Sequence, residues 1–329
     1  MRARTSTIST NNSLLFVHSR GFKPPEDALF DLCTAALRAG IQRDYPEHTH
    51  RFDKLSLHMA YYGDLTNQFL TELGQDYDHQ VDLGDRKNAL ADLRAVDARK
   101  KFGIRQYDCR PGKTAVPEFF ANFVAPLCGI FGLTKTLVRR LSPDFADYLA
   151  AESEYAKQAR ERVREKLCEL LDTDDRIILI SHGTGCVLVY DVLWQLSHDA
   201  RYIEQYGDKK IDTWITLGAP LGDNYIRKYL KGATGEPTSY PQNVISWHNV
   251  AAEDDYVCHD NTLKDDFKSM LQQQAVSVVH DYRVYNLAVR YGKSNPHSSV
   301  GYYIHPRVSK ILADWTRTPA AESDPVYTI

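Results

Sequence analysis

The chain of 329 residues lacks the compositional extremes that mark several classes of protein. Its formal charge is only −3, with 40 Lys and Arg against 43 Asp and Glu, so no basic excess favours nucleic acid binding. The 18 glycines and 14 prolines follow no repeat and form no low-complexity linker. A hydrophobic content of 43% with 25% charged residues excludes a disordered or fibrous chain and predicts a globular protein.

Cysteine is also sparse and lacks the spacing of a zinc site or a disulfide framework. The six cysteines are scattered, and no two of them form a CxxC pair. The run Cys258-His259-Asp260 cannot direct three adjacent side chains at one ion, and no partner pair at ligand spacing occurs elsewhere. We therefore expect free thiols in a reducing compartment, no metal and no cofactor.

The N-terminal sequence MRARTSTISTNNS lacks the apolar core and the cleavage site of a signal peptide. It is rich in Ser and Thr and runs directly into a short apolar stretch. We therefore expect a cytoplasmic protein.

One apolar segment, residues 119–138, has about the length that spans a bilayer. Its Pro126, Gly129 and Lys135 argue against a spanning helix. We interpret it as buried or surface-capping helices broken at Pro126 and Gly129. As an alternative, it is a lid over an apolar ligand pocket or a face that contacts a membrane surface. The expectation is no membrane span, with peripheral membrane contact left open.

Short apolar runs alternate with amphipathic segments along most of the chain. Strands are expected at residues 14–18, 55–62, 177–180, 212–217, 244–250 and 282–288. Helices are expected at residues 24–40, 86–101, 144–171 and 186–198. This alternation predicts the α/β class, as one domain with a mainly parallel central sheet and helices on both faces. Ligand sites in such sheets lie at the carboxyl ends of the strands.

Residues 176–197, RIILISHGTGCVLVYDVLWQLS, have the shape of a strand, a sharp turn and a helix. The turn resembles the nucleophile elbow of the α/β-hydrolase family, usually written GxSxG, with Ser181 and Gly185 at its outer positions. The nucleophile position holds Gly183 instead of serine. Small neighbours are needed there because the nucleophile has a strained backbone and the helix packs close to the strand. His182 is assigned no catalytic role.

Two further positions resemble the oxyanion-hole region of the same family. LLFVHSRGF, residues 14–22, resembles the segment that commonly supplies an oxyanion-hole N–H, and it includes His18. Ser19 stands where the family usually has glycine, and we treat it as a ligand-binding candidate. The residue after the nucleophile position, Thr184, is expected to supply the other N–H.

The remaining parts of the resemblance follow in the family's chain order. TLGAPLG, residues 216–222, resembles the turn after the elbow helix in lipase-like members. WHNVAAEDDYV resembles the acid-bearing turn, with Asp255 as the first candidate acid and Asp254 as the second. SNPHSSVGYYIHPRVSKILADW resembles the histidine loop and final helix, with His297 as the expected base. The resemblance implies an α/β-hydrolase-like domain at 13–316, a flexible N-terminus at 1–12 and a C-terminal tail at 317–329.

Other residues near the turn are weaker nucleophile candidates. Cys186 lies in the first turn of the expected helix, where a thiol pKa is lowered, although a small packed residue is the favoured interpretation. Ser181 is expected to face the core. A dinucleotide fingerprint at GTGCVL is disfavoured because Leu188 replaces the third glycine.

The function implied by the resemblance depends on the missing hydroxyl. A serine needs a histidine to accept its proton and a carboxylate to orient that histidine, and only these last two are retained. The first hypothesis is therefore a non-catalytic pseudo-hydrolase that binds a partner or a small acyl- or ester-type ligand. The alternative is an ester or lipid hydrolase, either with a serine deliberately replaced at position 183 or with a water activated by His297 and Asp255. A third hypothesis is an interaction protein that docks through residues 119–138, and the oligomeric state is left open.

Overall fold

A computed structural model of the chain describes residues 12–96, 102–111, 139, 142–150, 153–173, 176–234, 238–258 and 262–317. The apolar segment 119–138 and nearly all of the two expected tails lie outside these ranges. Within them, no helix combines the length and the apolarity that crossing a membrane requires.

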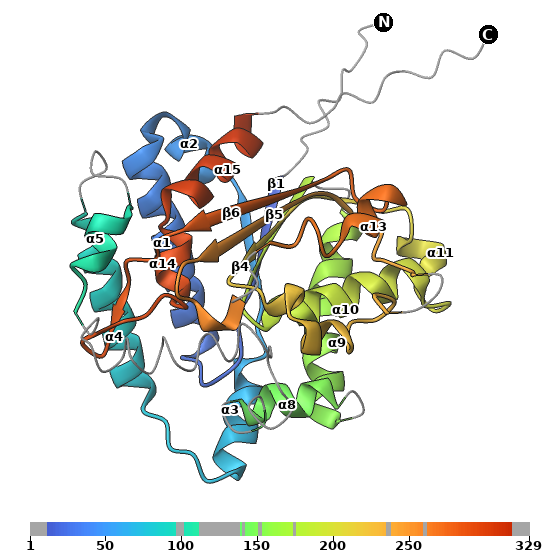
Figure 1. Cartoon of the computed structure of the whole chain (residues 1–329), viewed down its shortest axis with the longest axis horizontal. Coiled ribbons are helices and arrows are strands. Elements are labelled where there is room, and N and C mark those ends of the chain that lie inside the picture. The colour runs from blue at the N-terminus through green and yellow to red at the C-terminus, as the bar shows by residue number, and fades with distance from the viewer. Residues whose placement is uncertain are drawn as a thin grey trace, which may run out of the picture.

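Six parallel strands form the central sheet in the order β2-β1-β3-β4-β5-β6 (Figure 1). The strands are β1 (Asn12–Val17), β2 (Ser56–Ala60), β3 (Arg176–His182), β4 (Ile211–Leu217), β5 (Val244–Ala252) and β6 (Val278–Val284). After β1 the chain adds β2 on one side, then crosses over to add β3 on the other. The order thus reverses between β1 and β3, and open α/β sheets bind ligands beside such a reversal.

Helices cover both faces of this sheet (Figure 1). One face carries α8 (Pro143–Leu149), α9 (Glu154–Asp172), α10 (Gly185–His198), α11 (Ile203–Tyr206), α12 (Asn224–Arg227) and α13 (Lys268–Gln272). The opposite face carries α1 (Glu26–Asp44), α2 (Thr49–Phe52), α4 (His79–Arg94), α5 (Ile104–Asp108), α14 (Ser299–Tyr303) and α15 (Pro306–Arg317). The other described elements are α3 (Gly63–Glu72), the hairpin β7 (Val289–Arg290) and β8 (Lys293–Ser294), and short 3₁₀ turns at Pro46–His48, Pro220–Gly222 and Tyr256–Cys258.

Alternate residues of each strand supply the two hydrophobic cores. In β1, Leu15 and Val17 pack toward α9 and α10, whereas Leu14 and Phe16 pack toward α1 and α15. Successive side chains point to opposite faces of a strand, so a strand buried on both sides is apolar throughout. The expected α/β class, with a mainly parallel sheet and helices on both faces, is confirmed.

Two expected helices have different bounds because polar side chains start them elsewhere. The helix expected at 144–171 is two helices, and the second begins where Ser153 Oγ accepts the Ala156 N–H at 3.0 Å. The helix expected from Arg86 begins earlier, where Asp78 accepts the N–H of Gln80 at 2.9 Å. Local capping chemistry, rather than the apolar pattern, sets these boundaries.

The strand expected at 282–288 was also misplaced. β6 covers Val278–Val284 and pairs in parallel with β5 from Ser246 to Ala252. It is an edge strand, and most of its residues are only partly buried or exposed, so its sequence VVHDYRV is no apolar run. The apolar pattern identifies buried central strands better than this one.

Helix α10 begins in very close contact with the end of β1. A Cβ built on Gly185 would lie 2.2 Å from the carbonyl oxygen of His18 and 3.3 Å from that of Val17. These contacts are with backbone atoms, which cannot move aside to relieve a clash as the end of a flexible side chain can. Gly185 therefore allows the first turn of α10 to lie against the segment that follows β1.

We expect Gly185→Ala to lower the free energy of unfolding by about 1–3 kcal/mol, because overpacking against a backbone forces a local shift. Urea denaturation measures this loss. Gly84→Ala is the matched control: it lies within α4 with nothing inside 4 Å of the added Cβ. Alanine favours helix, so that variant should be neutral or more stable by up to about 1 kcal/mol. Equal stabilities of the two variants would contradict the close packing of α10 on β1.

Candidate active site

The turn between β3 and α10 directs residue 183 toward a histidine. Gly183 has a φ of +54°, in the left-handed region that favours glycine, and its N–H donates to the Leu217 carbonyl at 2.8 Å. A Cβ built on Gly183 would lie 2.9 Å from His297 Nε2 and 2.3 Å from Ser19 Oγ. The side-chain direction of Gly183 therefore points into a space shared by Ser19 and His297.

His297 is paired with a buried carboxylate on its other side. Its Nδ1 lies 2.9 Å and 3.1 Å from the two carboxylate oxygens of Asp255. The Asp255 side chain is 0% exposed, whereas that of His297 is 27% exposed. The same carboxylate accepts the hydroxyl of Tyr302 at 2.7 Å and the N–H of Val257 at 3.0 Å. Donation by Nδ1–H to Asp255 leaves His297 Nε2 as the proton acceptor that faces position 183.

The environment keeps Asp255 ionised. Burial alone would raise its pKa, but the charge and hydrogen bond of His297 and the hydroxyl of Tyr302 outweigh burial and lower the pKa. Burial and the neighbouring Asp255 raise the pKa of Tyr302 well above its ordinary value, so its hydroxyl remains a donor. The carboxylate is thus a charged, fixed partner for the imidazole.

Two buried side chains fix the loop that carries His297. His182 Nε2 lies 3.1 Å from the His297 carbonyl oxygen, and the two rings are 4.6 Å apart between centroids. Burial and the charge of His297 lower the pKa of His182 well below its ordinary value, so the ring is neutral and donates to that carbonyl. Asn286 donates to the carbonyls of Pro296 at 2.8 Å and Ser298 at 2.9 Å, one on each side of His297.

The residues expected in the oxyanion region gather beside Gly183. Ser19 Oγ accepts the N–H of Thr184 at 3.3 Å, and Thr184 Oγ1 accepts the N–H of Arg20 at 3.0 Å. His18 Nδ1 lies 2.8 Å from the Ser19 carbonyl oxygen, and His18 Nε2 accepts the Tyr62 N–H at 3.1 Å. Burial and the charge of Lys23 lower the pKa of His18 to about 3, so this ring is neutral and serves as a support.

The loop after Ser19 is held by Asp144 and Lys23 from two directions. The Gly21 N–H donates to Asp144 Oδ2 of α8 at 2.8 Å. Lys23 Nζ donates to the carbonyls of Gly21 at 3.0 Å and Phe22 at 3.3 Å, and also to that of Arg20. One side-chain nitrogen therefore contacts three successive carbonyls and closes the loop on itself, although burial lowers the pKa of Lys23 to about 7.

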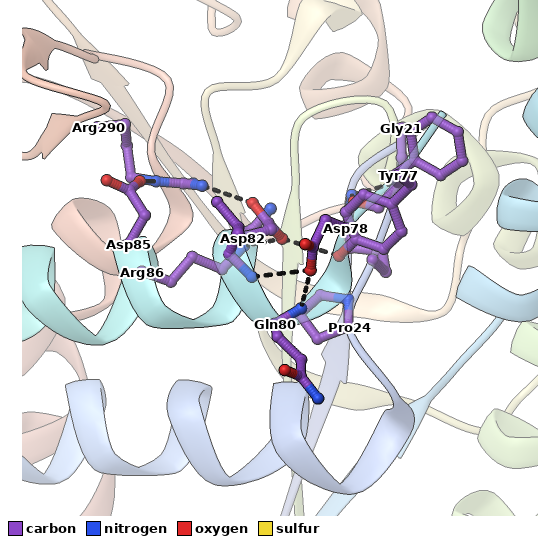
Figure 2. Close-up of polar contacts among 12 residues, drawn as sticks. Gly21, Pro24, Tyr77, Asp78, Gln80, Asp82, Asp85, Arg86 and Arg290 are labelled. Atoms are coloured by element: carbon purple, nitrogen blue, oxygen red, sulfur yellow. Dashed lines mark hydrogen bonds and ion pairs between the residues drawn. The ribbon is translucent and has the colours of Figure 1, made fainter. Parts of the chain in front are cut away.

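A network on α4 supports this loop from the outside. Phe22 stacks on Tyr77 with ring centroids 4.6 Å apart, and the Tyr77 hydroxyl donates to Asp82 at 2.9 Å. The carboxylate of Asp82 pairs with Arg86 at 2.8 Å and with Arg290 at 2.6 Å, and Figure 2 shows these three residues together. The side chains of Asp82 and Arg290 are only 7% and 9% exposed, so this ion pair joins α4 to β7 with little solvent screening.

Several candidates from the sequence lie away from the paired residues. Asp254 accepts the Tyr107 hydroxyl at 2.8 Å, whereas the contact with His297 belongs to Asp255. Cys186 is 0% exposed and burial raises its pKa to about 12, so it is a packed thiol. Ser181 Oγ donates to Cys186 at 3.1 Å and accepts from Trp214 at 2.8 Å, in the core as expected. His259 and Asp260 lie outside the described residues.

Sequence reasoning missed three residues that shape the site. Tyr302 and Asn286 act through contacts between segments that folding brings together, and no local pattern marks them. Gly218, with a φ of +56°, directly follows β4. A Cβ on Gly218 would lie 2.7 Å from Asp255 Oδ2 and 3.1 Å from His297 Nδ1. Gly218 was recognisable in the sequence as a glycine that directly follows an expected buried strand, where parallel sheets place their ligand sites.

Similarity to known proteins does not identify the family. Comparisons with protein-family models, curated proteins and solved structures found no match. A functional proposal therefore rests on the residues and on the geometry described above.

We expect Tyr302→Phe to destabilise the protein by about 1.5–3 kcal/mol at neutral pH, because Asp255 loses a hydrogen bond to its charged form. The folded-state pKa of Asp255 is lowered, so its stabilisation is present above the ordinary aspartate pKa and is lost as the pH falls through the lowered value. The effect of the substitution should accordingly shrink in acid. Urea denaturation at a series of pH values measures it.

Tyr303→Phe provides the matched control for this experiment. Tyr303 is 1% exposed and adjacent in sequence, and its side chain interacts with Cys33, not with Asp255. Because the Cys33 thiol is neutral, the loss of free energy of unfolding in Tyr303→Phe should be the same at each pH. An effect of Tyr302→Phe that is equally independent of pH would contradict the assigned role of its hydroxyl.

Proposed function

We propose that this chain is a carboxylic-ester hydrolase of the α/β-hydrolase type, in which His297 is the general base and Asp255 orients it. The observation that carries the proposal is the alignment of position 183, His297 Nε2, His297 Nδ1 and Asp255. A Cβ at 183 would lie 2.9 Å from Nε2, and Nδ1 lies 2.9 Å from the carboxylate. The chain order of elbow, acid and histidine supports the same interpretation.

The paired residues can move a proton in both directions. His297 Nε2 accepts a proton from a hydroxyl or a water that attacks the ester carbonyl. Asp255 then stabilises the positive imidazolium and keeps the ring in the required tautomer. The imidazolium returns the proton to the departing alcohol, so the base is regenerated in each half-reaction.

The start of α10 offers a donor for the negative oxygen that develops on the carbonyl. Thr184 is the N-cap residue of α10, which has 14 residues, and the helix dipole favours negative charge at this end. Its backbone N–H donates at present to Ser19 Oγ at 3.3 Å. A fixed N–H of this kind stabilises an oxyanion without reorganisation during the reaction.

The glycine at position 183 favours a second candidate, a pseudo-hydrolase that binds an acyl- or ester-type ligand without turnover. The buried carboxylate supports catalysis over binding alone. Asp255 is ionised although its side chain is 0% exposed, and a buried charge is costly unless it is paired and hydrogen-bonded. Such an arrangement is suited to stabilising a histidine that becomes charged, whereas an apolar acyl ligand has no need of it.

Asp255→Asn should reduce kcat/KM for p-nitrophenyl esters by about 10⁴-fold, because an amide favours the wrong imidazole tautomer. A series of acyl chain lengths gives the substrate range, and thermal unfolding shows whether the variant is folded. Asp254→Asn is the matched control, since Asp254 contacts Tyr107 and its φ of 60° is well tolerated by asparagine.

Retained turnover in Asp255→Asn, or an equal loss in Asp254→Asn, would refute the assigned roles. If the unaltered chain binds an acyl ligand and hydrolyses none of the esters, the pseudo-hydrolase is the correct description. Calorimetry with the corresponding fatty acids detects such binding without any chemical step.

A further inference from the structure

Ser19 lies where the missing side chain of residue 183 would begin. The ideal Cβ position of Gly183 is 2.3 Å from Ser19 Oγ and 3.0 Å from Ser19 Cβ. The same position is 2.9 Å from His297 Nε2, so Ser19 Oγ and Nε2 are separated by at most the sum of the two distances, about 5.2 Å. Ser19 is 5% exposed, and its hydroxyl is thus enclosed beside the proposed base.

The two departures from the family pattern, Ser19 and Gly183, are therefore neighbours in space and exchange serine and glycine between two positions. The family usually has glycine at the position of Ser19 and serine at the position of Gly183, and this chain has each residue in the other's place. A side chain at 183 and the hydroxyl of Ser19 in its present rotamer exclude each other, because non-bonded heavy atoms do not approach to 2.3 Å. We propose that Ser19 supplies the nucleophilic hydroxyl, an inference that rests on the proposed hydrolase function.

Contacts on both sides of Ser19 hold this residue in place, as the strand–turn–helix geometry holds the nucleophilic serine in the α/β-hydrolase family. The neutral ring of His18 holds the Ser19 carbonyl at 2.8 Å, and the ring stacks on Tyr62 with centroids 3.9 Å apart. The N–H of Thr184 donates to Ser19 Oγ and thereby holds this side chain in its present rotamer. Lys23 closes the following loop through three carbonyls. The backbone is thus held on both sides of Ser19, and Thr184 holds its hydroxyl.

The reaction proceeds in two balanced steps. Ser19 Oγ forms a bond to the ester carbonyl carbon while its proton passes to His297 Nε2, and the carbon–oxygen bond to the alcohol breaks as that proton is returned. Water then attacks the acylated Ser19, His297 accepts a proton from the water, and the carboxylic acid leaves with return of the proton to Ser19 Oγ. Ser19 Oγ at present accepts the Thr184 N–H, so the attack requires a rotation about the Cα–Cβ bond of Ser19 that brings Oγ to Nε2.

A fluorophosphonate probe tests this assignment on the unaltered chain. The probe phosphonylates an activated serine, and peptide mass spectrometry locates the modification. We expect modification of Ser19 that depends on His297, because His297→Ala removes the base. Labelling elsewhere in the chain, or no labelling, would overturn the inference without reliance on a Ser19 variant that folds.

Variants at position 19 separate a chemical role from a structural one. Ser19→Ala should abolish labelling and lower kcat for p-nitrophenyl esters by at least about 10³-fold. Ser19→Cys retains a nucleophile and should still form an acyl-enzyme detectable by mass. Ser181→Ala, a buried serine on β3 that contacts Cys186 and Trp214, should leave labelling unchanged. Full turnover in a folded Ser19→Ala protein would show that water is the nucleophile.

The reciprocal exchange distinguishes failure of this inference from failure of the proposed function. Gly183→Ser alone should lower the Tm and give no gain in kcat, since its Cβ meets Ser19 Oγ. Combined with Ser19→Gly it should restore stability and give labelling at position 183. Activity only in the double variant would overturn the role of Ser19 but retain the hydrolase site. Inactivity and absence of labelling in both the unaltered chain and the double variant would overturn both.

Discussion

The buried carboxylate of Asp255 is the interaction on which the geometry of the site depends. An ionised side chain with no exposure is stable only when several donors surround it. The imidazole of His297 and the hydroxyl of Tyr302 come from distant parts of the chain, and the N–H of Val257 comes from the same turn as Asp255. Each donor fixes a different segment. The need to neutralise one charge therefore sets the positions of the turn after β5, the histidine loop and α14 together.

Glycines make this convergence sterically feasible at two turns. Gly183 and Gly218 both have positive φ, and both follow neighbouring strands, β3 and β4. Gly218 leaves room for the contact between Asp255 and His297, and Gly183 leaves room for the hydroxyl of Ser19. The strand order explains why they meet, because the carboxyl ends of β1, β3 and β4 lie side by side at and next to the reversal of the sheet. Main-chain geometry thus determines which side chains can share the space.

The sequence predicted the parts of the fold that depend on local apolar pattern. The buried strands β1, β3 and β4 appear as short apolar runs, and the pairing of Asp255 with His297 follows the order of motifs. The edge strand β6 and the boundary between α8 and α9 were misplaced, because partial exposure removes the apolar signal and a cap at Ser153 interrupts an amphipathic pattern. Ser19 and position 183 meet in space although they are 164 residues apart in the sequence. The periodicity of apolar residues indicates local structure only, so it could not predict this contact.

A nucleophile on the loop after β1 would have a physical requirement that one on the β3–α10 turn does not. At the turn, a strained backbone between a strand and a helix fixes the side chain, whereas a loop needs supports of its own. The loop after Ser19 has them in layers: the three carbonyls bound by Lys23, the Gly21 N–H on Asp144, and the ring of Phe22 on Tyr77. The last of these connects through Asp82 to the buried pair with Arg290 (Figure 2). Because each of these layers acts on backbone or on a ring, together they fix the loop, while the hydroxyl of Ser19 is held separately by the N–H of Thr184.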